Sequence, residues 1–437
     1  MAGASASSVV LGARRPRVVI IGAGFGGLAA ARRLRGAAVD VVLVDQRNHH
    51  LFQPLLYQVA SALLDPSEIA YPVRASVRRG GNVDVRLGQV VGIDLGARRV
   101  HTDLGDLDYD QLIVAAGAVT NYFGNRSVEE RAFGLKSLGE ALALRNHLLA
   151  NFERAAWTDD AGERRRLMTI AIVGAGPTGV ELAGAFSELV HLVLRKDYPR
   201  LDLAAVRIVL LEGTDTVLAA FRPRLRDAAL RTLARKRVEV RLNAMVREST
   251  EGGIVLATGE RVACATVVWT AGVRGAEVGA MLGAPLTRQG RVAVEADLRL
   301  PGHPEVYVIG DLAVAMQKGR ELPMLGAVAV QQGHYVAGAI TAGLAGAHHP
   351  PFRYVDKGTM ATIGRNSAVA QLGPLSVSGF LGWLIWLGVH LILLVGFRNK
   401  LVALLNWGVD YFFYDRPVRL IATAARDEDS SAARPMP

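Results

Sequence analysis

One supersecondary pattern occurs twice in this chain, with about 150 residues between the copies. Residues 17–21 form a β-branched run that leads directly into Gly22-Ala23-Gly24-Phe25-Gly26-Gly27, and an Ala/Leu-rich stretch follows. Residues 168–173 lead in the same way into Gly174-Ala175-Gly176-Pro177-Thr178-Gly179. Runs that are apolar on both faces are typical of parallel strands covered by helices. The repeat therefore predicts an α/β fold with two Rossmann-like dinucleotide-binding domains.

In the first copy, each glycine of the motif has a separate task. Gly22 permits the tight turn, Gly24 lets the backbone approach a pyrophosphate, and Gly27 allows close contact between helix and strand. The free N–H groups and the dipole at the helix N-terminus then face the phosphates. Asp45 ends the next strand, where a carboxylate accepts hydrogen bonds from ribose hydroxyls. Strand, glycines, helix and acid thus coincide, which favours a nucleotide site over a simple glycine-rich turn.

The second copy has the same three glycines, and its acid is Glu212. The spacing to this acid is longer, because residues 190–204 read as an insertion. A carboxylate here pairs with a 2′-OH and repels a 2′-phosphate, which favours NADH over NADPH. Arg222 and Arg224 follow shortly and would act in the opposite direction.

Two dinucleotide sites in one chain suggest FAD in one and a nicotinamide nucleotide in the other. Between the copies, short strands at 83–117 suggest a small antiparallel insertion. A strand at 306–311 lacks a glycine fingerprint and returns the chain to the first domain, so that the second domain is an insertion. We expect a disordered tail at 1–16, an FAD-binding domain at 17–140 and 285–345, an NADH-binding domain at 141–284, and a separate C-terminal region at 346–437.

Composition excludes several classes of function. The single cysteine, Cys264, rules out a disulfide framework, a four-cysteine zinc site and a Cys-x-x-Cys redox pair. The histidines are not spaced as metal ligands, and we expect no metal. The net charge of +10 comes mostly from dispersed arginines without an aromatic-interleaved stripe, which argues against nucleic acid. Dispersed charge of this kind is typical of a solvated surface, and the alternative is attraction to an anionic bilayer surface.

The C-terminal segment raises the question of a membrane. Residues 379–397 carry no formal charge and would extend about 28 Å as a helix, close to the hydrocarbon thickness of a bilayer. Trp383, Trp386 and His390 share one stripe, however, and Arg398-Asn399-Lys400 interrupts the run. With the aromatic run at 411–414, these features favour two helices that lie in the membrane interface, with aromatics at headgroup level, over a buried helix in the dimer interface of a soluble protein.

In these motifs the chain resembles the type II NADH:quinone oxidoreductases, within the two-dinucleotide-binding flavoprotein superfamily. The runs 50–60 and 331–333 are the most particular to that family. The matching stretches span residues 17 to 333 in the family's order and are 18–27, 48–60, 112–118, 174–181, 267–272, 310–311 and 329–333.

The resemblance implies a glutathione-reductase-like fold, non-covalent FAD, and hydride transfer from NADH to FAD followed by two-electron reduction of a membrane quinone without proton pumping. It implies catalytic roles for Glu181, Gln331 and Gln332. The implied FAD-binding residues are Gly22, Gly24, Phe25, Gly26, Gly27, Asp45, Gln46, Gln58, Ala116, Gly117, Gly310 and Asp311. The implied NADH-binding residues are Gly174, Gly176, Pro177, Thr178, Gly179, Glu212 and Gly272.

One departure from the family pattern concerns the quinone site, where the family's first glutamine is Ala327. The resemblance also implies that residues 346–437 form the membrane-association and quinone-site region, with peripheral, monotopic attachment to the cell membrane on the cytoplasmic side, and it is compatible with a homodimer. Other flavin-dependent pyridine nucleotide reductases and a non-enzymatic flavoprotein redox sensor are the alternatives. A sulfide:quinone oxidoreductase needs cysteines near the flavin, and a ferredoxin reductase does not need the apolar C-terminus.

Overall fold

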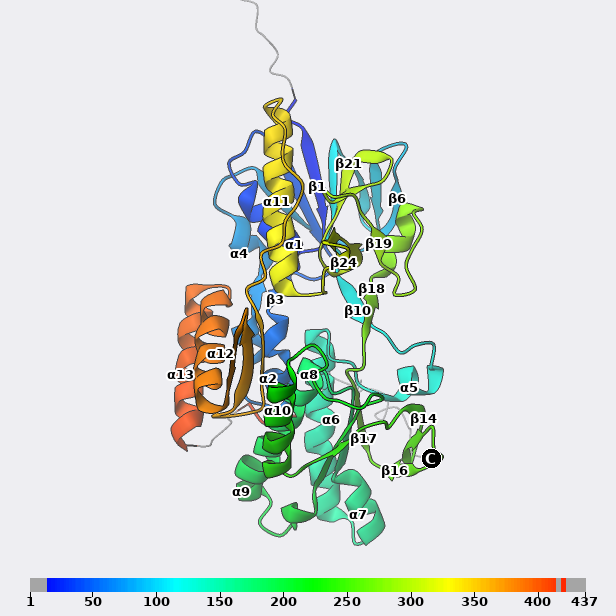
Figure 1. The fold of residues 1–437 in the computed structure, drawn as a ribbon, viewed down its shortest axis with the longest axis vertical. Coiled ribbons are helices and arrows are strands. Elements are labelled where there is room, and N and C mark those ends of the chain that lie inside the picture. Colours follow the sequence, from blue (N-terminus) through cyan, green and yellow to red (C-terminus); the bar gives the residue numbers. More distant parts are fainter. Residues whose placement is uncertain (1–13, 414–417, 422–437) are drawn as a thin grey trace, which may run out of the picture. The chain divides into compact units, whose positions relative to one another are not determined.

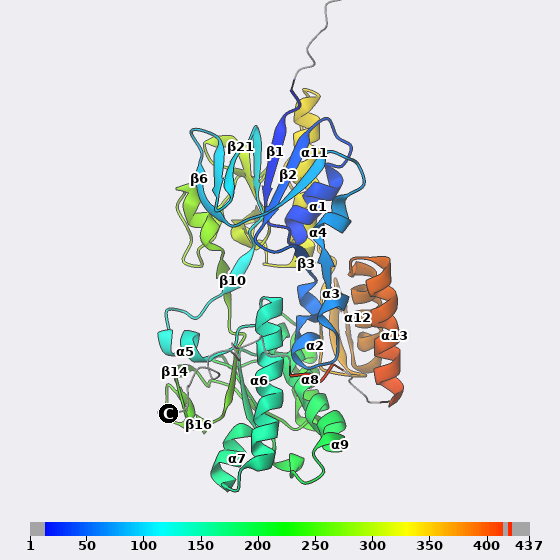
Figure 2. The same cartoon turned by 180° about the vertical axis from the view of Figure 1, so that it is seen from behind.

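A computed structural model describes residues 14–413 and 418–421, and both strand–glycine–helix patterns are present in it (Figure 1; Figure 2). The described residues divide into a first unit (14–50, 72–118 and 275–354) and a second unit (51–71, 119–274, 355–413 and 418–421). These bounds differ from those of the expected domains, since residues 119–140 and 51–71 belong to the second unit. The chain passes between the units near the short strands β3 (His49–Leu51), β4 (Ala70–Pro72), β10 (Ala118–Thr120) and β18 (Val273–Gly275).

The first unit is built on a sheet of six strands. Its helices and strands are β1 (Arg17–Ile21), α1 (Phe25–Arg33), β2 (Asp40–Asp45), α4 (Val73–Val77), β5 (Val83–Leu87), β6 (Val90–Asp94), β7 (Arg99–Thr102), β8 (Gly105–Asp108), β9 (Gln111–Val114), β19 (Val292–Ala293), β20 (Arg299–Leu300), β21 (His303–Val308), β22 (Ala313–Val314), β23 (Met316–Gln317), β24 (Arg320–Glu321) and α11 (Gly326–Leu344). The sheet order is β20-β21-β9-β1-β2-β5, and only β20 runs antiparallel to its neighbour. Because β21 pairs with β9, the chain returns to this sheet after the second unit's sheet, as predicted.

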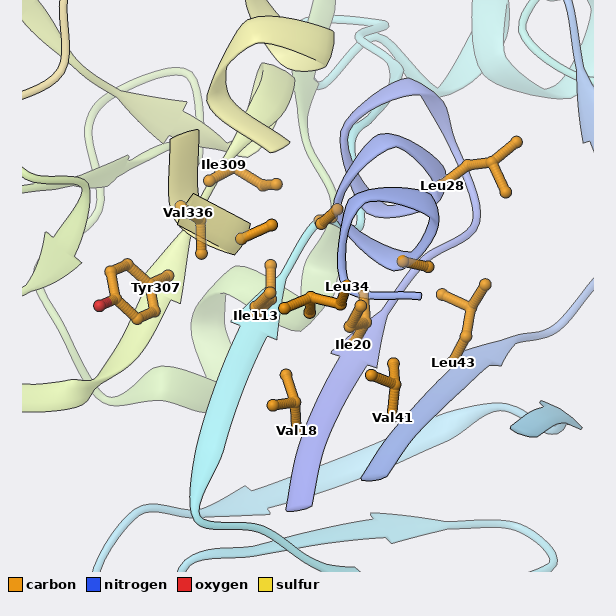
Figure 3. Close-up of a cluster of buried hydrophobic side chains, with 14 of the residues drawn as sticks. Val18, Ile20, Leu28, Leu34, Val41, Leu43, Ile113, Tyr307, Ile309 and Val336 are labelled. Carbon is orange, nitrogen blue, oxygen red and sulfur yellow. The ribbon is translucent and has the colours of Figure 1, made fainter. Parts of the chain in front are cut away.

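Both faces of this sheet are buried, as its apolar strands predict. Val18 and Ile20 of β1 face a cluster that includes side chains of α1 and α11 (Figure 3), whereas Val19 faces a second cluster on the opposite side. The two helices pack closely because Gly333 of α11 has no side chain: a Cβ there would lie 2.2 Å from a backbone carbonyl oxygen of α1. This contact fixes the helix that follows the first glycine loop.

Strand β5 corrects one expectation from the sequence. The antiparallel insertion was expected to begin there, but β5 pairs parallel with β2 from Val41↔Val83 to Asp45↔Leu87. Its alternating charged and apolar residues have a physical reason, because an edge strand has only part of its surface covered. The antiparallel insertion consists of β6, β7 and β8 alone.

The second unit contains a parallel sheet in the order β13-β12-β11-β17 and two small antiparallel sheets. Residues 189–194 continue α8 as one stretch of π-helix. The helices and strands of this unit are α2 (Leu56–Ala60), α3 (Pro66–Ile69), α5 (Arg126–Arg131), α6 (Leu138–Trp157), α7 (Ala161–Leu167), β11 (Thr169–Val173), α8 (Pro177–Glu188), α9 (Arg195–Asp197), β12 (Arg207–Leu211), α10 (Pro223–Arg235), β13 (Val238–Arg241), β14 (Val246–Thr250), β15 (Gly253–Leu256), β16 (Arg261–Ala263), β17 (Thr266–Trp269), β25 (Thr359–Thr362), β26 (Ala368–Leu372), β27 (Leu375–Ser378), α12 (Gly379–Leu393) and α13 (Phe397–Phe413).

The C-terminal helix α12 lies beside the antiparallel sheet β25-β26-β27, and α13 packs against α12 and α3 (Figure 1). The sequence predicts the break between them at Arg398-Asn399-Lys400, but these residues lie inside α13, and the break falls at residues 394–396. The C-cap of α12, Leu394, leaves the helical conformation with a ψ of 137°, and Gly396, whose φ of +90° favours glycine, lies directly before α13. Among the described residues, no helix combines the length and the apolar character that crossing a membrane requires.

The aromatic stripe of α12 faces the protein, which corrects its expected position at the lipid headgroups. Trp386 is 2% exposed, and its ring stacks on buried His390 with 4.3 Å between centroids. The ring centroid of Trp407 in α13 lies 6.0 Å from that of Trp386. The stripe is therefore the core of the contact between the two helices. The aromatic run 411–414 lies outside the side chains that the structure describes.

Candidate functional site

The first glycine loop has the geometry that its motif predicts. Gly22 has a φ of +99°, and a Cβ at Gly27 would lie 1.8 Å from the Gly22 carbonyl oxygen. Asp45 braces the loop, because one carboxylate oxygen accepts a hydrogen bond from Ala23 N–H (2.7 Å) and the other accepts from Arg47 N–H (2.8 Å). The acid thus lies at the turn that the glycines form.

The second glycine loop is built in the same way. Gly174 has a φ of +103°, and a Cβ at Gly179 would lie 1.9 Å from the Gly174 carbonyl oxygen. Glu212 accepts hydrogen bonds from Ala175 N–H (2.8 Å) and, with its other oxygen, from Thr214 N–H (3.0 Å). A carboxylate offers about four acceptor positions, so each acid keeps capacity for ribose hydroxyls.

The middle glycine of each loop faces open space. Apart from each glycine and its two chain neighbours, no protein atom lies within 4 Å of the position that a Cβ would take at Gly24 or Gly176, although the flanking glycines are tightly packed. Both glycines are helix N-caps without a side-chain cap bond, and neither helix has an acidic residue in its first turn. Free N–H groups, the helix dipole and room for a ligand therefore coincide at both loops, which fits one dinucleotide pyrophosphate at each. Gly117, with a φ of +71°, also faces open space.

The second flavin signature, Gly310-Asp311, is held by two buried side chains. Gln332 of α11 is 1% exposed, and its Oε1 accepts a hydrogen bond from Gly310 N–H at 2.6 Å. Arg291 donates from Nε to the Asp311 carbonyl oxygen (3.1 Å) and from Nη2 to the Ala313 carbonyl oxygen (2.6 Å). The side-chain carbonyl of Gln332 is thus already hydrogen-bonded to the backbone of the first unit. The catalytic roles expected for Gln332 and for the half-buried Gln331 stay predictions.

The remaining residues expected to bind FAD lie in different surroundings. In the first unit, Phe25 and Ala116 are half-buried and Gln46 is exposed, while Gly26 packs against Ile309 of the chain segment after β21. Gln58 lies in the second unit and is buried there: its Nε2 donates to the Tyr57 hydroxyl (2.8 Å), and its Oε1 accepts from Trp407 Nε1 (3.0 Å). The structure thus shows Gln58 as a link between α2 and α13.

Arg222 does not act against Glu212 in this structure. Its guanidinium donates hydrogen bonds to the carbonyl oxygens of Gly373 and Pro374 in the turn between β26 and β27. Its backbone N–H donates to Gln371 Oε1 at 3.1 Å. One of the two cations that the sequence places near the second acid is therefore committed to the C-terminal sheet.

Glu181 is a buried carboxyl on the second turn of α8. It is 8% exposed, and its Oε1 accepts a long hydrogen bond of 3.4 Å from Thr362 N–H at the end of β25. Burial raises the pKa of Glu181 to about 8, and the Thr362 amide opposes that rise. A carboxyl of this kind keeps its proton at neutral pH, which suits acid–base chemistry near pH 7.

A second buried acid, Glu188, holds the turn between β25 and β26 against α8. Glu188, two helical turns after Glu181, accepts hydrogen bonds from Lys236 Nζ (2.6 Å) and from Arg365 N–H (2.5 Å). Between the two acids, Gly184 lets the backbone of the turn lie directly on the helix, since a Cβ there would be 2.7 Å from Ile363. The C-terminal sheet is therefore anchored to the helix that begins at the second glycine loop.

Comparison with known proteins identifies the family. Residues 16–333 match the family described as pyridine nucleotide-disulphide oxidoreductase, and residues 357–415 match the NDH2 C-terminal domain. Over 413 residues, the chain is 44% identical to the type II NADH:quinone oxidoreductase Ndh of Mycobacterium tuberculosis. The alignment covers 91% of this chain and 88% of the relative. The chain belongs to the type II NADH:quinone oxidoreductase family.

This oxidoreductase is similar to a second relative from the same organism, NdhA, with 44% identity over 91% of this chain and 87% of the relative. Its fold is similar to the solved structure of NDH2 from Plasmodium falciparum in complex with NADH. The TM-score is 0.86 at 18% identity, with 94% of this chain and 100% of that chain covered. The family resemblance and the fold class expected from the sequence are thereby confirmed.

Sequence reasoning missed three polar residues that hold the nucleotide loops of this oxidoreductase. Arg291 carries no signal in the sequence. Thr270 Oγ1 lies 2.9 Å from the carbonyl oxygens of both Val173 and Gly174, at the end of a strand that the motif analysis does cover. His50 Nδ1 lies 2.9 Å from the Ala23 carbonyl oxygen, and burial lowers the pKa of His50, so its neutral ring donates there. The signal for His50 was its place at the start of the family-specific run 50–60.

Proposed function

We propose that the first unit binds FAD non-covalently, that the second binds NADH, and that the enzyme transfers electrons from NADH to a membrane quinone. The duplicated loop carries this proposal, because each copy combines a braced acid, free helix N–H groups and open space at its middle glycine. FAD, when bound, would supply the redox chemistry, which is hydride transfer from NADH and two-electron transfer to the quinone. The chain's own residues bind and orient the nucleotides and hold protons.

In the first unit, Gly24 and the N-terminus of α1 would hold the pyrophosphate, Asp45 the ribose, and Asp311 the ribityl chain. Arg291 and Gln332 keep the backbone at Gly310 and Asp311 in place through the hydrogen bonds described above. In the second unit, Gly176 and Glu212 would hold the corresponding parts of NADH.

Glu181 is the proton-holding group that we propose for quinone reduction, which consumes two protons. Its Oε1 faces the Thr362 amide, so the proton resides on Oε2. Because burial raises its pKa to about 8, the carboxyl is protonated at neutral pH and can be recharged from solvent. Glu181→Gln would keep the shape but could not release a proton.

The outer face of α12 and α13 is the part that we propose to enter the bilayer. The helices turn their polar side chains inward: Asn399 Nδ2 donates to the Ser67 and Glu68 carbonyl oxygens, and Asn406 Nδ2 donates to Glu68 Oε1 at 2.7 Å. The opposite face consists of large apolar side chains that are 43–72% exposed: Phe380, Leu381, Leu384, Ile392, Leu393, Leu401, Leu404, Leu405 and Val409. Each half-exposed leucine gains about 1 kcal/mol when lipid covers it, so this face favours peripheral attachment, which we place on the cytoplasmic side.

Two glycine variants test the redox assignment. Gly24→Ala should give a folded protein without a yellow chromophore, because the new Cβ occupies the space for the FAD pyrophosphate. Gly176→Ala should keep FAD but lose its reduction by NADH. The wild type should oxidise NADH continuously with a short-chain quinone; a single stoichiometric bleaching of flavin without turnover would identify a sensor and refute the enzyme.

Membrane attachment is tested separately by flotation with vesicles of mixed neutral and anionic phospholipid. Leu404→Glu combined with Leu405→Glu should release the protein from the vesicles without loss of bound FAD. Leu104→Glu is the matched control, since Leu104 is 78% exposed in the first unit and should not affect binding. Equal flotation of all three proteins would refute the proposed face. The expected homodimer stays a prediction that light scattering in detergent tests.

A further inference from the structure

The order of strands in the second unit's parallel sheet predicts which way NADH lies across the sheet edge. All four strands of the order β13-β12-β11-β17 are parallel, so their carboxyl ends meet at one edge. Glu212 follows β12, the glycine loop from Gly174 follows β11, and residues 270–272 follow β17. If the adenosine ribose lies at Glu212 and the pyrophosphate at the loop, as the proposed function requires, the nicotinamide half extends toward the end of β17.

The glycine loop and the end of β17 are in direct contact. A Cβ at Gly174 would lie 2.6 Å from Ala271 Cα. The Thr270 hydroxyl is within hydrogen-bond distance of the carbonyl oxygens of Val173 and Gly174. The next residue, Gly272, therefore borders the path beyond the pyrophosphate. Its neighbour on the far side is an aromatic ring: a Cβ at Gly272 would lie 2.9 Å from Phe123 Cζ.

Phe123 is held in an unusual way for an apolar residue. Its side chain is 65% exposed, and its φ of +54° lies in the left-handed region that bulky residues rarely adopt. Asn121 imposes this turn, because its Oδ1 accepts from Phe123 N–H (2.8 Å) while its own N–H donates to the Gly272 carbonyl oxygen (3.0 Å). Trp269 Nε1 donates to the Asn121 carbonyl oxygen at 2.8 Å, which ties the turn to β17.

These contacts hold an exposed ring at the end of β17 and force Phe123 into a backbone conformation that phenylalanine disfavours. An exposed ring in a strained backbone adds little to the stability of the fold, so stability alone does not account for this arrangement. Strain that the surrounding structure enforces is typical of functional positions. We propose that Phe123 binds the nicotinamide half of NADH, with its ring as a wall against which the nicotinamide ring packs. This inference deepens the proposed function and rests on it.

The test compares two ligands that share the adenosine and pyrophosphate. NADH carries the nicotinamide riboside, and ADP-ribose lacks the nicotinamide ring. With the full-length, FAD-loaded enzyme, Phe123→Ala should lower kcat/KM for NADH about 3- to 10-fold, the range expected for loss of one aromatic contact. The inhibition constant of ADP-ribose against NADH should stay unchanged. Phe123→Tyr should restore kcat/KM, because it keeps the ring.

Two further variants keep the result interpretable. Phe123→Asn removes the ring but suits the left-handed backbone, so it should reproduce the effect of Phe123→Ala even where alanine disturbs the turn. Trp157→Ala removes another exposed aromatic, 88% exposed at the end of α6, and should change neither value. Unchanged kcat/KM in both Phe123 variants, or equal losses for NADH and ADP-ribose, would overturn the proposal. Absence of NADH oxidation by the wild type would instead refute the proposed function.

Discussion

Replacing Glu181 by glutamine tests whether burial raises the pKa of this carboxyl. The test measures how the free energy of unfolding depends on pH and does not depend on enzyme activity. In the folded chain, burial raises the pKa of Glu181 from 4.5 to about 8, while in the unfolded chain the carboxyl keeps its ordinary value. Below pH 4.5 both states hold the proton, and the full stability is present. As the pH rises toward 8, only the unfolded state releases the proton, so the free energy of unfolding falls.

The size of this loss follows from the two pKa values. One pKa unit corresponds to about 1.36 kcal/mol, so the wild type should lose about 1.4 kcal/mol by pH 5.5 and about 4.6 kcal/mol by pH 8.5. Glutamine does not titrate, and Glu181→Gln should therefore gain about 3 kcal/mol on the wild type between these pH values. For a unit of about 240 residues, this corresponds to a relative rise in Tm of roughly 6–12 °C.

The assay is thermal unfolding of both proteins, saturated with FAD, at several pH values between 5.5 and 8.5. Glu129→Gln serves as control, because Glu129 is exposed on α5 and its replacement should give a difference that does not depend on pH. A Tm difference between Glu181→Gln and wild type that stays constant over this range would show that Glu181 ionises normally. That result would also remove the reason for assigning it a proton-holding role.

Three other predictions concern single contacts. Glu212→Gln should raise the ratio of kcat/KM for NADPH to that for NADH by about 10-fold or more, because it removes repulsion of the 2′-phosphate; an unchanged ratio would mean that other groups set the preference. Lys236→Met leaves Glu188 buried without its cation and should lower the free energy of unfolding in urea by about 3 kcal/mol, with part of that loss recovered when Glu188→Gln is added. Arg291→Met should weaken FAD binding by about 10-fold in a fluorescence titration, since Asp311 loses the guanidinium that holds its backbone; equal affinity would show that the clamp is dispensable.

The sequence predicted the parts of the fold that local patterns determine. The strand at 17–21 and the glycine loop after it follow from β-branched residues and from turns that only glycine fits, and both are present as expected. The inserted second sheet followed from the repeat of that pattern. The strand at 83–87 was misassigned because an edge strand of a parallel sheet alternates in polarity, as an antiparallel strand does.

The rest depended on contacts that no local pattern reveals. Arg398 and Lys400 were expected to interrupt a helix, but both residue types have good helix propensity. The break falls before them, at the C-cap Leu394 and at Gly396 with its left-handed φ. The buried state of Glu181 depends on a turn 181 residues away in sequence. Phe123 escaped notice because neither its exposure nor its contact with Gly272 can be read from a single sequence.

Helix α8 connects the nucleotide loop with the proposed membrane face inside the second unit. Its N-terminus carries the second glycine loop, Glu181 follows one turn later, and Glu188 anchors the turn that precedes β26. Strands β26 and β27 lead directly into α12, whose first residue, Gly379, follows Ser378 at the end of β27. Because Gly184 lets this turn lie on the helix without an intervening side chain, α12 is fixed relative to the NADH loop by backbone contact. A protein that must offer NADH from water and a quinone from lipid to one redox centre needs such a rigid link, since a displacement of either site would lengthen the path of the electrons.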